Sequence, residues 1–73
     1  MQDIQKWVGI RIRALREQKN LSQEALADLC GINRSHMGKI ERGEVNLGVA
    51  TLFSITLKLG VTMTAFFKGL SNE

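Results

Sequence analysis

Residues 22–43 constrain the fold of this chain more than any other stretch. They read SQEALADLCGINRSHMGKIERG. Ser22 and Asn33 belong to the residue types that cap helix N-termini, and each precedes a segment with apolar residues at helical spacing. Gly31 lies between these segments and Gly43 follows the second, where a sharp turn or a helix end requires a flexible backbone. The stretch therefore predicts two short helices joined by a tight turn.

The length of 73 residues predicts one domain, residues 1–73, with a small core. A domain of this size buries only about 60% of the surface that its unfolded chain exposes. The single cysteine excludes an internal disulfide, and the cysteine and histidine spacings of zinc modules are absent. A partner subunit is the usual remaining source of stability for so small a domain.

The chain is modestly basic, with ten Lys and Arg against seven Asp and Glu and a net charge of +3. Such a charge is compatible with a nucleic acid or an anionic surface as the partner. Only the positions of the basic residues can distinguish between these two kinds of partner. The N-terminal segment includes Asp3 and lacks the apolar run of a signal peptide, and no stretch reaches the ~18 apolar residues of a membrane span. We therefore expect a cytoplasmic protein with no membrane partner.

Helical periodicity recurs along almost the whole chain, and no run of alternating apolar and polar residues predicts a strand. The expected fold is therefore all-helical. The first helix has one apolar face, made by Ile4, Val8, Ile12 and Leu15. Helices are expected over residues 2–19, 23–30, 34–42, 49–59 and 62–70.

The last two segments, about residues 49–70, contain more apolar side chains than a core of this size needs. Methionine, phenylalanine and leucine repeat at helical spacing in the fifth segment, so part of it has to pack on the core. The surplus predicts a dimer interface made by Phe53, Leu57, Phe67 and Leu70. Phe67 and Leu70 could equally be core residues, and the sequence leaves that choice open.

The third helix has two unlike sides. At about 100° per residue, Met37 and Ile40 define its inward side. Gly38 falls on the outward side, where it would let a ligand approach closely. Glu41 falls beside the apolar side, and an acid so near a core requires a partner; we expect Arg16 of the first helix to supply it. The polar residues of the outward side are Arg34, Ser35, His36, Lys39 and Arg42.

This outward side suits the major groove of double-stranded DNA. Arginine and lysine donate to guanine O6 and N7, serine serves several bases, and histidine reaches a base or a phosphate. Ser22 and Gln23, at the start of the preceding helix, could hold a phosphate oxygen, and Arg42 and Asn46 could hold another. A solvent-facing polar helix is the simpler explanation of the composition. The coincidence of two capped helices, a glycine turn and a basic outer side nevertheless favours DNA.

The chain also resembles a known family. The motifs LSQEALA at residues 21–27, GIN at 31–33 and IERGE at 40–44, together with IRALR at 12–16, are similar to the Cro/repressor-type helix-turn-helix family, also called the Xre family. The resemblance runs from about residue 8 to residue 67. Within that family, NRSHMGKIERGEVN is most similar to the controller proteins of restriction-modification systems.

The resemblance implies a compact five-helix, lambda-repressor-like fold, a homodimer and a palindromic operator. Gly38 stands where family members commonly carry a polar residue, and Leu47 replaces a frequent proline. The implied ion pair joins Arg16 and Glu41. The implied base-reading residues are Arg34, Ser35 and Lys39, and the implied phosphate contacts are Ser22, Gln23, His36, Arg42 and Asn46.

The expected function is therefore sequence-specific transcriptional regulation by a homodimer on an inverted-repeat operator. One alternative is an antitoxin-type or phage-type repressor with a protein partner. Another is an interaction module whose apolar C-terminal helix binds a partner helix. No phosphate-binding glycine loop and no His-Glu-x-x-His motif is present, so we expect no enzymatic activity, no metal, no cofactor and no small-molecule ligand.

Overall fold

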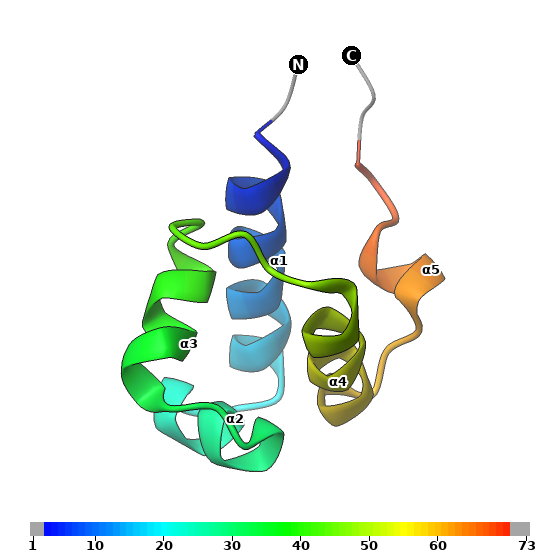
Figure 1. Ribbon diagram of the computed structural model, residues 1–73. Helices are drawn as coiled ribbons and strands as arrows, with labels where there is room; N and C mark the ends of the chain where they lie inside the picture. The colour runs from blue at the N-terminus through cyan, green and yellow to red at the C-terminus, as the bar shows by residue number, and fades with distance from the viewer. Residues whose placement is uncertain (1–2, 71–73) are drawn as a thin grey trace.

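The computed structural model describes residues 3–70, and Figure 1 shows how their helices are arranged. This part of the chain contains five helices and no strand, as expected from its periodicity. The helices are α1 (Ile4–Gln18), α2 (Gln23–Cys30), α3 (Arg34–Glu41), α4 (Val49–Leu59) and α5 (Met63–Phe66). No helix among these residues has the length and apolar composition needed to cross a membrane.

Local capping sets most of the helix ends. Ser22, Asn33 and Thr62 each accept a hydrogen bond from the backbone N–H three residues further on, and so begin α2, α3 and α5. Gly31 and Gly60 end α2 and α4 in the left-handed conformation, with φ of 67° and 74°. These ends agree with the sequence-based expectation because each depends on residues within one turn of the helix.

The first and last helices differ from expectation. α1 begins at Ile4, and Gln2, which was expected inside it, lies outside the described residues. α5 was expected to extend to residue 70 but ends at Phe66. Arg11 of α1 supplies a reason, because its Nε and Nη2 atoms donate to the carbonyl oxygens of Phe66 and Ala65, each at 3.0 Å. The carbonyl oxygen of Ala65 also accepts from the backbone N–H of Lys68 at 3.3 Å, so the chain after Phe66 forms a tighter turn than an α-helix.

The core lies between the five helices, and each of them contributes at least one buried apolar residue. Trp7 covers one end of this core, where its ring lies edge-on to Phe66 at 6.0 Å and stacks on Phe67 at 5.8 Å. Ile4 was assigned to the apolar face of the first helix but is 47% exposed, because it lies at the rim of a cavity described below. The buried core residues are Val8, Ile12, Leu15, Leu26, Ala27, Met37, Ile40, Leu52, Ile55, Leu59 and Phe66.

Gly9 brings α1 and α3 into backbone contact, a feature that has no signal in the sequence pattern. A Cβ atom at this position would lie 2.6 Å from the carbonyl oxygen of Ile40 and would also overlap the carbonyl oxygen of Glu41. The absence of a side chain at Gly9 therefore sets how closely the two helices approach. α3 is held against α1 at the turn that carries Glu41.

Candidate nucleic-acid interface

α3 forms one flank of the fold, with α1 between it and α5 (Figure 1). Its inward residues Met37 and Ile40 are 0% and 2% exposed, as the helical periodicity predicted. Asn33 accepts from the backbone N–H of His36 at 2.9 Å, which closes the first turn of the helix. The residues of α3 and its C-cap that are exposed on the other side are Arg34, Ser35, His36, Lys39 and Arg42.

An open hollow lies beside the N-terminal half of α3. Ser35, His36 and Lys39 line it from α3, and the turn at residues 31–33 lines its end. Thr51 of α4 also lines the hollow and is not among the residues expected at the site. A hydroxyl group on a neighbouring helix carries no recognisable sequence signal, because only the packing of α4 beside the turn brings it to this surface.

Arg16 and Glu41 form a buried, bidentate ion pair. Arg16 Nε lies 2.8 Å from Glu41 Oε2 and Arg16 Nη2 lies 3.0 Å from Glu41 Oε1. The two side chains are 11% and 3% exposed. The hydrogen bonds to Glu41 raise the pKa of Arg16 above its ordinary value, so the guanidinium stays charged. Its Nη1 atom also donates to the carbonyl oxygen of Leu21, at 2.8 Å.

The start of α2 is attached to this ion pair. Gln23 Nε2 donates to Glu41 Oε1 at 3.1 Å, so one end of the glutamine amide is engaged within the protein. Ser22 is exposed, and its Oγ accepts from the backbone N–H of Ala25 at 3.0 Å. That geometry leaves the serine hydroxyl hydrogen available to an outside acceptor. The ion pair thereby connects α1, α2 and α3 through hydrogen bonds.

Arg42 lies at the C-terminal end of α3 and pairs with Glu44. Its Nε and Nη2 atoms lie 2.9 and 3.3 Å from the two carboxylate oxygens. The hydrogen bonds raise the pKa of Arg42 and lower the pKa of Glu44, so both groups are charged at neutral pH. The pair lies at the surface, where a phosphate oxygen could replace the carboxylate as the partner of the guanidinium.

Gly38 does not lie open on the outer side of α3, and that expectation was wrong. It is buried beneath the side chains of Gln23 and Arg42. A Cβ atom at position 38 would lie 3.1 Å from Arg42 Nη1 and 3.4 Å from Gln23 Oε1. Arg42 covers Gly38 because a helical side chain leans toward the preceding turn. Gln23 reaches the same place from α2, a contact that a helical wheel of α3 cannot include.

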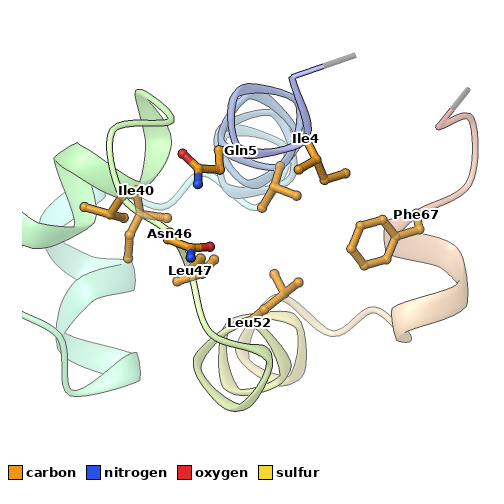
Figure 2. Close-up of a pocket in the computed structure, with 9 residues that line it drawn as sticks. Ile4, Gln5, Ile40, Asn46, Leu47, Leu52 and Phe67 are labelled. Carbon is orange, nitrogen blue, oxygen red and sulfur yellow. The ribbon is translucent and has the colours of Figure 1, made fainter. Parts of the chain in front are cut away.

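An apolar cavity of about 180 Å³ opens between α1, the connection after α3, α4 and α5. Figure 2 shows Ile4, Leu52 and Phe67 around one part of it, and the carboxamides of Gln5 and Asn46 near another. Asn46 is exposed. It lies in the connection that follows α3, four residues after Arg42.

The expected dimer residues divide into two groups. Phe53 and Leu57 lie one turn apart on α4 and are 51% and 60% exposed. Val49, one turn earlier, is 77% exposed and extends the same apolar row. Phe67 and Leu70 are half-buried, and Phe67 stacks on Trp7 within the molecule. Of the residues expected at the dimer interface, those exposed to solvent are therefore the two on α4.

Comparison with known proteins gives a consistent result. The family HTH_3, described as helix-turn-helix, matches residues 12–66. The control protein C.SmaI of Serratia marcescens is 34% identical over 97% of this chain and 87% of its own length.

Two solved structures of controller proteins are also similar to this chain. The restriction-modification controller protein C.AhdI from Aeromonas hydrophila has a TM-score of 0.80 and 37% identity, over 85% of this chain and 94% of that one. The controller protein C.Esp1396I, crystallised as a tetramer with its natural 35 base-pair operator, has a TM-score of 0.83 and 30% identity. That similarity covers 92% of this chain and 88% of that one.

Proposed function

The chain belongs to the HTH_3 helix-turn-helix family, and we propose that it is a cytoplasmic, sequence-specific transcriptional regulator that binds an inverted-repeat operator as a homodimer. Its task is to control a restriction-modification system, as the names of its relatives C.SmaI and C.AhdI suggest. The observation that carries the proposal is the outer side of α3. Five exposed polar residues there project from a helix whose other side is held in the core.

We assign the residues of this surface by their position along the groove. Base edges are read by Arg34 and Ser35, because side chains near the N-terminal end of a recognition helix usually reach them. Lys39, in the last turn of α3 and exposed on the same outer side, is assigned as a third reader. The surrounding residues contact phosphates and set the orientation of the protein on DNA. These phosphate contacts are Ser22, Gln23, His36, Arg42 and Asn46.

Selection of bound sequences from a random DNA pool tests the proposed function. A symmetric dimer places its two recognition helices about 34 Å apart, so the selected sequences should contain an inverted repeat with half-site centres roughly 10 base pairs apart. Absence of enrichment at low salt would refute DNA binding. Protection of a single asymmetric half-site by a monomer in footprinting would refute the dimeric arrangement.

Arg34→Ala should remove one base contact while leaving the phosphate contacts intact. Binding to the selected operator should weaken by about 1–3 kcal/mol, with relaxed preference at one base position in each half-site. Competition binding against operators altered at each position measures both effects. Arg42→Ala is the matched control, since losing a phosphate contact should weaken all sequences alike and reduce the salt dependence. Equal losses on operator and random DNA for Arg34→Ala would contradict its role as a reader.

Phe53→Glu should separate the dimer by placing a carboxylate in the apolar row on α4. The dissociation constant of the dimer should rise roughly 30-fold, because an important interface residue contributes ~2 kcal/mol to association and this contribution would be lost. Sedimentation equilibrium measures this constant. Ile10→Glu is a control of the same chemistry, because Ile10 is 68% exposed on α1, outside the predicted interface. If both variants dimerise like the wild type, the interface has been assigned to the wrong surface.

A further inference from the structure

Gly38 occupies a position where glycine is unfavourable unless its small size is needed. It lies inside α3 and has no positive φ, in contrast to Gly31 and Gly43. An alanine in a helix interior is more favourable than glycine by roughly 1 kcal/mol, because glycine loses more backbone entropy on folding. The backbone conformation therefore does not explain the glycine, and the explanation has to come from the space around it.

Two side chains occupy that space. Arg42 Nη1 and Gln23 Oε1 would lie 3.1 and 3.4 Å from a Cβ atom at position 38, and the first of these separations is tighter than an ordinary contact. Apart from residues 37 and 39 and the backbone of α3 itself, these two polar atoms are the nearest to that point in the described part of the chain. Gln23 comes from the start of α2 and Arg42 from the end of α3, and both reach the space beside Gly38.

Each of these side chains is also held from its far side. Gln23 Nε2 donates to Glu41, which is paired with Arg16, so the carbonyl end of the glutamine amide is the end that lies over Gly38. The Nε and Nη2 atoms of Arg42 contact Glu44, and Nη1 is the nitrogen directed to Gly38. Glu41 and Glu44 thus hold the two polar groups in orientations that leave little room for a side chain at position 38.

We propose that Gly38 is a positioning residue for DNA binding: the absence of its side chain lets Gln23 and Arg42 lie across the middle of α3, in the positions from which they contact phosphates. The inference rests on the proposed function. It assigns no base contact to residue 38 itself. Glycine at position 38 weakens the recognition helix. The proposal explains its presence, because the space it leaves is filled by two side chains that contact DNA.

Gly38→Ala tests the proposal because its effects on folding and on DNA binding should have opposite signs. The melting temperature should rise by about 4 °C, since the helix gains from alanine and the exposed end of Arg42 can move aside. Affinity should fall about tenfold on operator and random DNA alike. This is the loss expected when one hydrogen bond to a charged group, at the low end of the usual strength, is removed. The slope of log affinity against log salt should become shallower, by up to ~0.9 for one lost phosphate contact.

A double-mutant comparison shows whether the effect passes through Arg42. In an Arg42→Ala background, Gly38→Ala should change DNA affinity by less than about twofold, because Arg42, which would be the closer of the two groups to the new methyl group, is already absent. Gly48→Ala is the matched control, since a Cβ atom there has no neighbour within 4 Å. It should leave DNA affinity unchanged.

Three outcomes would overturn the proposal. The first is a Gly38→Ala variant that is more stable but binds DNA as tightly as the wild type, which would reduce the glycine to a helix-propensity effect. The second is a variant with altered preference among operator sequences and unchanged binding to random DNA, which would make position 38 a reader of bases. The third is a wild-type chain without salt-sensitive DNA binding, which would refute the proposed function as well. The first two outcomes concern only the Gly38→Ala variant and leave the proposed function intact.

Discussion

Glu41→Gln should lower the free energy of unfolding by about 3 kcal/mol, because it leaves the guanidinium of Arg16 buried without a counter-charge. Glutamine preserves the shape of the side chain, so the loss reports the charge and not a cavity. The pair is bidentate and nearly inaccessible, which excludes water as a substitute partner. Urea unfolding measures the change, and the melting temperature should fall by more than about 10 °C for a domain of this size.

The exposed ion pair of Arg13 and Glu17 supplies the control for that experiment. Its atoms are 3.3 Å apart and its side chains are 65% and 56% exposed. Glu17→Gln should therefore change stability by no more than about 0.5 kcal/mol, since solvent screens such pairs. A melt of Glu41→Gln indistinguishable from that of the wild type would end the view that the buried pair holds α1 and α3 together.

Gly9→Ala should destabilise the fold by about 3 kcal/mol, at the upper end of the usual effect of overpacking. The added methyl group would meet the backbone carbonyl groups of Ile40 and Glu41, and backbone atoms cannot rotate away as a flexible side chain can. α1 would have to move from α3, which would also strain the ion pair between Arg16 and Glu41. Denaturant unfolding and circular dichroism measure the change.

Gly38→Ala is the natural comparison for Gly9→Ala. Both replace a glycine inside a helix, but the substitution at position 38 should stabilise the fold. Helix propensity alone predicts a gain of roughly 1 kcal/mol at both sites. Only the surroundings differ, with backbone atoms facing Gly9 and the ends of two polar side chains facing Gly38. If Gly9→Ala proves as stable as the wild type, the close approach of α1 and α3 does not depend on the glycine.

The hydrogen bonds around Glu41 connect folding to the proposed DNA surface. Arg16 belongs to α1, Gln23 to α2 and Glu41 to α3, so one buried carboxylate joins the three helices. The helices that would contact DNA are thereby fixed relative to one another before binding. Preorganised contacts of this kind reduce the entropy that ordering would otherwise cost on association. Substitutions at Glu41 should consequently affect stability first and binding second.

The helix-turn-helix unit could be predicted from the sequence because its signals are local. Ser22 and Asn33 cap the helices that follow them, and Gly31 forms the turn between, as expected. The inward direction of Met37 and Ile40 follows from periodicity alone. The same periodicity places Glu41 beside the apolar side of α3. Because a buried acid needs a cation as its partner, an ion pair could be expected there. Each of these inferences uses residues within a few turns of the same helix.

The tertiary structure alone decided the features that join distant parts of the chain. α5 ends at Phe66, whose carbonyl oxygen accepts a hydrogen bond from Arg11, 55 residues earlier in the chain. Gly9 permits a backbone contact between α1 and α3 that no spacing in either helix reveals. Gly38 is covered by Gln23 from another helix, so its exposure could not be read from a wheel of α3. Periodicity reports the direction of a side chain, whereas these features depend on how closely separate helices approach and on which polar groups then meet.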